Sequence, residues 1–561
     1  MKIRIAVLIT MVAAAWTCWA DLATPAANGF AAVSSTFYVN TNADFLNIAN
    51  DTEHPGVDIA ANGNIMVGWE NDGDEITDFE AVWTLYGPTG TPLTPLTLQT
   101  NRSTAGDVPT YETTTNPWLS FFRDDDTAIG GYTGWGGSWP KANRFGNGLG
   151  WSAMCWEIGL EISELFDINM ANGAGGDDAP YTQLLNNDGT PLRPGVINGM
   201  TNLGILAFTV ADVTPDGSIR CGEIEYLSSG NIAVVGESRQ ADDWALTGQT
   251  SGNVPVYRVW TPGGLEVHTY AAASSERIGG DIYRGVGVTA NGFAIRWGAN
   301  TGGSTIRLFD NAGNPVSTNI NLATLTGHPE VAGGGDGGGC GFHGNGVDAY
   351  VWANSGGSPA TPWVTVINAD GTLRWSREVQ DDSDPIDDST SGDVDGAIDA
   401  SGRVIAVFSS PALTNGDNVV TSLVQARMFD KAGNPLGPKF VVSETESQPA
   451  DPFAVYTTET PRVAWRGNNV VFIWLSKNSP TNPGFPVLAA RILAAPITVT
   501  SVSRSGTTTT INWTGGKAPY SLRQRSPLTG TWSTVKTGIA GNSTTYTDSN
   551  ANAYYQVLCS Q

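Results

Sequence analysis

Aromatic side chains gather on one glycine-rich stretch of the sequence. Between residues 130 and 177, tryptophans occur among many glycines, at Trp135, Trp139, Trp151 and Trp156. The apolar faces of indole rings stack on the C–H faces of sugars, and glycine lets a loop approach a ligand closely. We therefore take Trp135, Trp139 and Trp151 as candidate glycan-binding residues. The alternative is that these rings are buried and cover a long insertion.

Carboxylates crowd a second stretch, between residues 381 and 395. Its members are Asp381, Asp382, Asp384, Asp387, Asp388, Asp393 and Asp395. Oxygen ligands crowded on one loop suit Ca²⁺, which makes Asp384, Asp393 and Asp395 candidate metal ligands. The spacing does not match an EF-hand loop, which needs acidic residues at alternate positions and a glutamate at the twelfth. A solvated acidic loop without metal is the alternative.

Motifs that would identify a catalytic centre are missing from the sequence. None of the four histidines lies in an HExxH motif, and there is no Gly-x-Ser-x-Gly elbow. Hydrolysis of a glycosidic bond needs two carboxylates that flank a sugar, and a chain this acidic offers many candidates without identifying a pair. The sequence therefore names no catalytic residue.

The charge of the chain excludes some partners. The formal net charge is −25, with only 29 lysines and arginines against 54 acidic residues. Nucleic acid and anionic lipid would both be repelled by such a surface. After the N-terminal apolar stretch no run approaches the length of a membrane-spanning helix. The composition predicts a soluble protein that does not bind nucleic acid.

The N-terminus predicts secretion. Lys2 and Arg4 precede an apolar stretch from Ile5 to Trp16, and Ala20 follows at a position that suits signal-peptide cleavage. We expect residues 1–20 to be a signal peptide. The expected location is extracellular or at the cell surface.

Four cysteines remain after such cleavage: Cys155, Cys221, Cys340 and Cys559. Four cysteines allow three disulfide pairings, and the sequence does not choose among them. Their spacing does not match a zinc site. They are expected to be structural cysteines or free buried thiols.

A repeated unit predicts the fold. Its first half is two apolar strands joined by a glycine turn and ending near tryptophan, as in residues 57–69 and 288–297. Its second half is a third strand, a tight turn and a short fourth strand, as in residues 307–316 and 427–436. The proline after each turn is expected at the start of an edge strand, where its missing N–H costs little.

Seven such units occur, and four-stranded units repeated radially form a β-propeller. The seventh unit lacks its fourth strand, whereas Phe37–Thr41 is a strand that belongs to no unit. We therefore predict an all-β, seven-bladed propeller over residues 36–495, closed by this N-terminal strand. Residues 21–35 are expected to be a linker, and residues 130–177 a long insertion in the second blade.

From Pro496 the pattern changes to six short alternating strands. Residues 496–561 resemble a fibronectin type III module, on the evidence of Ile511-Asn512-Trp513, Tyr520-Ser521-Leu522 and Tyr546-Thr547-Asp548, followed by Tyr554-Tyr555-Gln556-Val557. The resemblance implies a small β-sandwich that serves as a spacer or attachment domain.

These observations together resemble a secreted bacterial seven-bladed β-propeller protein with a C-terminal fibronectin type III-like domain. The expected function is non-catalytic recognition of a glycan or an extracellular protein. The alternative is a polysaccharide-acting hydrolase or lyase that uses the central funnel of the propeller. Apart from Ca²⁺, no cofactor is expected.

Overall fold

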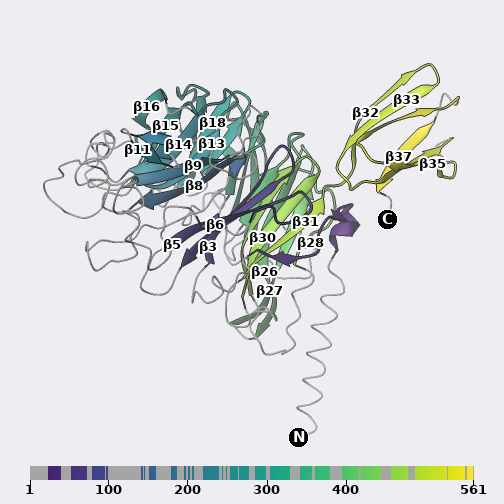
Figure 1. The fold of residues 1–561 in the computed structure, drawn as a ribbon, viewed down its shortest axis with the longest axis horizontal. Coiled ribbons are helices and arrows are strands. Elements are labelled where there is room, and N and C mark those ends of the chain that lie inside the picture. Colours follow the sequence, from purple (N-terminus) through teal and green to yellow (C-terminus); the bar gives the residue numbers. More distant parts are fainter. Residues whose placement is uncertain are drawn as a thin grey trace, which may run out of the picture.

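Short antiparallel strands joined by tight turns make up most of the described chain (Figure 1). The two helical elements named here are short: η1 (Pro25–Asn28) and α7 (Leu322–Thr326). The computed structural model describes residues 23–39, 52–72, 79–94, 97–98, 141–142, 145, 151–158, 179–185, 195–197, 200–202, 205–206, 219–238, 240, 243, 245, 248, 253–262, 265–276, 285–298, 303–328, 341–356, 361–379, 394–415, 418–443, 457–477, 487–526, 529–549 and 553–559.

Within these residues, six four-stranded antiparallel sheets follow one another along the chain. The first two sheets contain β3 (Thr52–Ile59), β4 (Ile65–Asp72), β5 (Phe79–Tyr86) and β6 (Thr97–Leu98), and then β7 (Lys141–Ala142), β8 (Trp151–Ile158), β9 (Ala179–Leu185) and β12 (Ile205–Leu206). The third and fourth contain β13 (Ile219–Tyr226), β14 (Ile232–Ser238), β15 (Val254–Trp260) and β16 (Glu266–Ala272), and then β17 (Val286–Thr289), β18 (Gly292–Gly298), β19 (Ser304–Asp310) and β20 (Ile320–Asn321). The fifth and sixth contain β21 (Gly341–Gly344), β22 (Ala349–Gly356), β23 (Thr361–Asn368) and β24 (Leu373–Glu378), and then β25 (Val394–Ile398), β26 (Val404–Asn415), β27 (Asn418–Phe429) and β28 (Phe440–Val441).

A further sheet joins the two ends of this series. It contains β29 (Thr457–Arg466), β30 (Asn469–Lys477) and β31 (Val487–Ala494), together with β1 (Ala31–Ala32) and β2 (Phe37–Tyr38). Phe37 pairs with Ala490, and Ala31 with Ala494. The predicted N-terminal strand therefore pairs with β31, and the pairing begins earlier than predicted, inside the range expected to be a linker.

The first strand of each sheet contacts the first strand of the next. These contacts run from β3 to β7, then to β13, β17, β21, β25 and β29, and β29 contacts β3. Small antiparallel sheets arranged in this order make a β-propeller-like all-β fold. The predicted fold class is confirmed at this level.

Glycines permit the turns within each sheet. Gly63, Gly230 and Gly402 each have φ between +85° and +88° in the turn after a first strand. Gly313 and Gly433 have φ of +92° and +83° in the turn after a third strand. L-residues with a Cβ rarely adopt this backbone conformation, which is why the hairpin predictions from Gly were correct.

An aspartate organises the turn after the third strand. Asp430 Oδ1 accepts hydrogen bonds from the backbone N–H of Ala432 (2.9 Å) and Asn434 (2.8 Å), and its Oδ2 accepts one from Asn434 Nδ2 (2.9 Å). Asp310 makes the same three bonds in its own turn. Pro435 then forms a single bridge to Phe429. The predicted turn, with proline at the start of an edge segment, is thus present.

Replacing Asp430 with Ala should lower the free energy of unfolding by about 1 kcal/mol, because three turn donors lose their acceptor at an exposed site. Burial alone would raise the pKa of Asp430. Hydrogen bonds from Asn434, Ala432 and Gly433 stabilise the charged carboxylate by more than burial disfavours it, so the pKa is lowered. Its contribution to stability is therefore present above the ordinary aspartate pKa and is lost as pH falls through the lower folded value.

Urea unfolding at neutral pH and at about pH 3 checks this expectation. The matched variant is Asp430→Asn, whose amide keeps one acceptor and does not titrate. A stability difference from wild type that stays the same at both pH values would contradict the assigned role.

Neighbouring sheets are fixed to one another by a repeated contact. A side chain from the outer strand of one sheet lies against the turn glycine of the next, where a Cβ would come within 2.5 to 3.1 Å of it. The pairs are His268 with Gly313, Ile320 with Gly371, Trp375 with Gly433, and Phe37 with Gly90. Phe37 of β2 therefore takes the position that fourth strands take in other sheets.

Arginines on third strands add a second link between sheets. Arg307, Arg427 and Arg491 each donate a hydrogen bond to a carbonyl that follows the outer strand of the preceding sheet. The acceptors are Ala273 O (2.6 Å), Val379 O (2.7 Å) and Val442 O (2.6 Å). Charged donors satisfy these partly buried carbonyls more strongly than neutral ones do.

The range predicted as a long insertion, residues 130–177, contains strands of the second sheet. Both β7 and β8 lie in it, and β8 pairs with β9 along its length. The alternation of apolar and acidic residues around Trp156 is therefore that of a sheet strand. The separate hairpin of β10 (Gly195–Ile197) and β11 (Met200–Asn202) follows β9.

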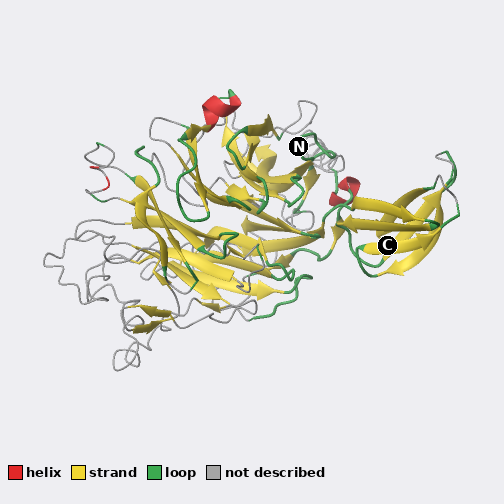
Figure 2. Cartoon of the chain, turned by 90° about the horizontal axis from the view of Figure 1, so that it is seen from above, coloured by secondary structure: helices red, strands yellow, loops and turns green. Residues whose placement is uncertain are grey.

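The C-terminal strands stand apart from the propeller-like part (Figures 1 and 2). They form two three-stranded sheets, one of β32 (Thr498–Ser505), β33 (Thr508–Thr514) and β36 (Ser543–Thr547), the other of β35 (Ser533–Ile539), β34 (Tyr520–Arg525) and β37 (Tyr554–Cys559). Trp513 and Tyr520 pack edge to face in the core between them. The predicted number of six short strands is thus present in this segment.

Hydrogen bonds join the C-terminal sheets to the propeller-like part. Asn468 Oδ1 accepts from Gly515 N (2.7 Å), Arg403 donates to Thr498 Oγ1 (2.6 Å), and Lys517 donates to Ala32 O (3.2 Å). Asn468 and Arg403 lie in the turns that follow β29 and β25, and Ala32 lies in β1. More contacts cross the boundary than a flexible tether would make.

Among the cysteines, Cys559 is a free thiol whose Sγ accepts a hydrogen bond from Lys517 N (3.2 Å). The side chains of Cys155, Cys221 and Cys340 lie outside the described part. In the described ranges, no helix has the length and apolarity needed to cross a membrane.

Candidate functional site

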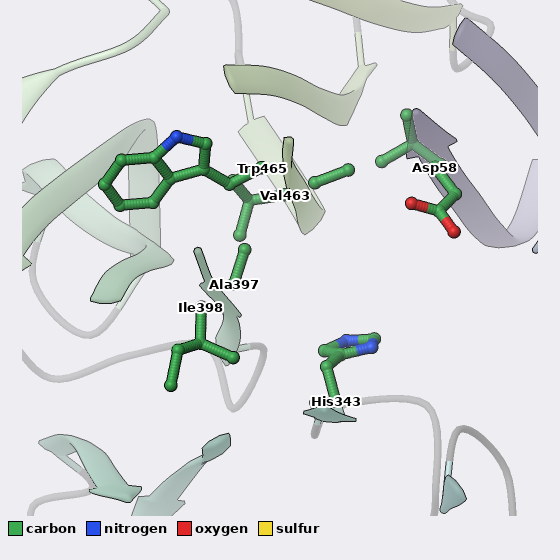
Figure 3. Close-up of a pocket in the computed structure, with 8 residues that line it drawn as sticks. Asp58, His343, Ala397, Ile398, Val463 and Trp465 are labelled. Atoms are coloured by element: carbon green, nitrogen blue, oxygen red, sulfur yellow. The ribbon is translucent and has the colours of Figure 1, made fainter. Parts of the chain in front are cut away.

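Three ionisable side chains from three different first strands meet near the centre of the propeller-like part. They are Asp58 of β3, His343 of β21 and Asp395 of β25. Asp58 and His343 line a cavity of about 20 Å³, together with Val463 and Trp465 of β29. Figure 3 shows the Asp58 carboxylate and the His343 ring on the same side of this cavity, with Trp465 on the other.

Asp395 holds the imidazole of His343. Its side chain is 0% exposed, and its Oδ1 lies 3.1 Å from His343 Nε2. The same carboxylate accepts the backbone N–H of Gly396 (2.9 Å) and of Val463 (3.0 Å). Because a carboxylate only accepts, Nε2 of His343 carries the proton in this contact.

The contact from Asp395 to the next sheet has a counterpart elsewhere. Glu223 occupies the matching position of β13, and its Oε2 accepts the backbone N–H of Val286 (2.6 Å) at the start of β17. In both cases a buried carboxylate supplies the acceptor for an N–H on a first strand, whose inner edge has no partner strand. Part of the role of Asp395 is therefore structural.

A glycine makes room for Asp395. A Cβ added at Gly341 of β21 would lie 1.8 Å from Asp395 Oδ1. Only glycine at this position leaves the carboxylate where it reaches both His343 and Val463. The close approach of neighbouring first strands thus dictates residue type on both sides of the contact.

The cavity beside Asp58 has room for one water molecule and none for a sugar ring. Asp58 is 4% exposed and His343 14%. Asp58 Oδ1 accepts the backbone N–H of Ile59 (2.8 Å), which fixes the carboxylate. A carboxylate and an oriented imidazole around a water-sized space can hold a water molecule and remove its proton.

Of the site residues predicted from the sequence, only Asp395 has a side chain within the described part of the chain. Trp135 and Trp139 lie outside the described residues, and Trp151 begins β8 with its side chain undescribed. Asp384 and Asp393 also lie outside them. Asp395 is described, and its oxygens accept two backbone N–H groups and face His343; its role as a Ca²⁺ ligand stays a prediction. Within the described ranges there is no cluster of three or more metal-binding side chains.

Sequence reasoning missed Asp58 and His343. Each is the second-last residue of a first strand and stands between apolar or small residues, in Val57-Asp58-Ile59 and Phe342-His343-Gly344. The aligned position of β25 is Ala397. A charged residue at an otherwise apolar position of the repeat was the available signal.

No protein-family model and no curated protein matches this chain. Solved structures that match it include a protein of unknown function from Dyadobacter fermentans, with 12% identity over 83% of this chain and 99% of that one, at a TM-score of 0.33. A sialidase from Streptococcus pneumoniae has 10% identity over 82% of this chain and 70% of the sialidase chain, at a TM-score of 0.37. An α-L-arabinofuranosidase from Fusarium graminearum has 7% identity over 80% of this chain and 95% of the arabinofuranosidase chain, at a TM-score of 0.32.

The prediction of a non-catalytic recognition protein is corrected by this comparison. The matching structures include sialidases, arabinofuranosidases and an endo-arabinase, which cleave glycosidic bonds. At these TM-scores the likeness assigns no substrate and no residue, so the chemistry has to come from the side chains of this chain.

Proposed function

We propose that this protein cleaves glycosidic bonds of an extracellular polysaccharide at the axis of its propeller. The observation that carries the proposal is the meeting of Asp58, His343 and Asp395, from three separate sheets, beside a water-sized cavity. Apolar strand positions seldom hold ionisable groups unless these are paired or used.

Each residue has a distinct proposed role. Asp58 takes a proton from the water as the water oxygen bonds to the anomeric carbon of a sugar ring that lies outside the cavity. The glycosidic C–O bond breaks, and the leaving oxygen takes a proton from His343 in its protonated form. Asp395 acts through His343 and is a positioning residue. In the lyase form of the proposal, the water passes a proton from a ring carbon of the sugar to Asp58. A C=C bond forms, the glycosidic C–O bond breaks, and the leaving oxygen takes a proton from protonated His343.

The test is cleavage of a panel of neutral and acidic polysaccharides by the mature chain, followed through new reducing ends. Asp58→Asn and His343→Gln should each lower the rate about a hundredfold, the usual loss on removing a general acid or base. Asp370→Asn, in an exposed turn, and His328→Gln, beside Trp363, are the matched controls. An unsaturated, ultraviolet-absorbing product indicates lyase chemistry. Unchanged rates in both site variants would overturn the proposed site.

We further propose that the seven sheets are blades of one closed ring. Two facts support closure at the chain ends. The first is the run of contacts between first strands, in which β29 is followed by β3. The second is the placement of Phe37 against Gly90, the same contact that joins other neighbouring sheets.

The remaining proposals concern location and the C-terminal module. Residues 1–20 are proposed to direct secretion, and the partner of the mature protein is proposed to be a glycan. Residues 496–561 are proposed to be a fibronectin type III-like sandwich, supported by two facing three-stranded sheets around Trp513.

A further inference from the structure

The C-terminal sheets have a charge opposite to that of the rest of the chain. Residues 496–561 contain five basic residues and one acidic residue, which gives this segment a net charge of +4. The net charge of the whole chain is −25, so residues 1–495 carry −29. The charged residues of this segment are Arg504, Lys517, Arg523, Arg525, Lys536 and Asp548. A polyanion repelled by most of the protein can therefore be attracted here.

Two of these arginines share one solvent-facing sheet surface. Along β34, Tyr520, Leu522 and Gln524 are buried, whereas Arg523 and Arg525 alternate with them on the outer side. Both side chains are half-buried, and neither arginine forms an ion pair with a carboxylate in the described part of the chain. Their charges are available to a ligand.

Aromatic rings lie beside these charges. The guanidinium of Arg525 stacks over Trp532 at 4.4 Å from the ring centroid. Tyr554, which is 42% exposed, pairs with Arg525 across β34 and β37, and Gln556 pairs with Arg523. We call Arg523, Arg525, Trp532, Tyr554 and Gln556 the basic aromatic surface.

The basic aromatic surface lies at the end of the module away from the propeller-like part. β34 begins at Tyr520, whose hydroxyl donates to Gly515 O (3.1 Å) at the junction, and it ends at Arg525. Five strand residues span about 17 Å, more than the Debye length of about 10 Å at 0.1 M salt. The acidic propeller is thus screened from a ligand bound there.

We propose that the basic aromatic surface binds an anionic polysaccharide. The arginines pair with carboxylate or sulfate groups of the polymer, Trp532 and Tyr554 lie against sugar rings, and Gln556 donates to hydroxyls. Such binding attaches the protein to an acidic glycan and does not require the proposed cleavage at the axis.

Binding of the full mature chain to immobilised polygalacturonate tests the proposal, with dextran as the neutral probe and poly-L-glutamate as a polyanion without sugar. We expect binding to polygalacturonate that weakens at least tenfold between about 20 and 200 mM salt, as counterions are released. Arg523→Gln with Arg525→Gln should weaken it at least tenfold at low salt. Trp532→Ala should weaken it severalfold.

The matched control is Lys431→Gln with Lys517→Gln, which removes the same charge outside the surface and should change the affinity less than about twofold. Melting curves establish that each variant is folded. Wild-type affinity in the double arginine variant overturns the proposal, as does equal affinity for poly-L-glutamate. Asp58→Asn should leave binding unchanged, so failure of the cleavage and failure of this surface are distinguishable.

Discussion

Removing residues 31–39 is expected to destabilise the protein by at least about 4 kcal/mol. The deletion takes away two strands from β31, including the hydrogen bonds from Val33 N to Ile492 O (3.0 Å) and from Val39 N to Leu488 O (2.8 Å). It also removes buried Val39 and partly buried Phe37 and Tyr38 from two core clusters. Each apolar side chain buried on folding contributes roughly 1.5 to 3 kcal/mol when fully buried.

Thermal unfolding and size-exclusion chromatography measure the effect. The unpaired edge of β31 should also promote association, since open sheet edges pair with other chains. Phe37→Ala keeps the strand but removes the ring from Gly90, and should cost about 1 to 2 kcal/mol without association. A deletion variant that stays monomeric and has the same melting temperature as the wild-type protein would contradict the placement of this segment.

Gly341→Ala should lower the free energy of unfolding by about 3 kcal/mol or more, and it should also abolish the proposed activity. Its Cβ would stand 1.8 Å from Asp395 Oδ1, so the carboxylate must leave His343, Val463 N, or both. Displacing a buried carboxylate from its donors is among the costliest single changes in a protein. The ring of His343 then also loses the group that orients it.

Gly396→Ala is the matched control, because it lies on β25 beside Asp395, and its added Cβ would meet Ala353 Cβ at 3.1 Å, which a small shift relieves. Denaturant unfolding compares the two variants. Equal loss of stability in both would show that the contact with Asp395 is not what requires glycine at position 341.

Much of the fold was predictable because its determinants are local. Asn-Gly and Ser-Gly turns require positive φ at one residue, and the Asp430 turn is built within five consecutive residues. β1 was missed, since Ala31-Ala32 has no alternating pattern and its pairing with β31 is purely tertiary. The second sheet was harder to recognise, because β7 and β8 lie inside the range predicted to be an insertion and β9 follows it at a distance in the sequence.

The candidate site was not predictable in the same way. Asp58 and His343 lie hundreds of residues apart, and they approach one another only when the first strands gather around a common centre. Acidic residues were sought in clusters along the sequence, whereas the structure joins single residues from separate repeats. Asp395 was named for calcium, and no sequence pattern indicated that its carboxylate accepts the N–H of Val463 on the first strand of the next sheet.

The pairing of the N-terminal segment with β31 also bears on the order of folding. Ser34 Oγ accepts the backbone N–H of Ile492, a contact between residues 458 positions apart. Closing so long a loop costs little extra in equilibrium, since the entropy grows by only about 0.6 kcal/mol for each doubling of length. It is slow, however, because contacts distant in sequence form late. Residues 31–39 can pair only after residues 487–494 have been synthesised, so this sheet is completed late in folding.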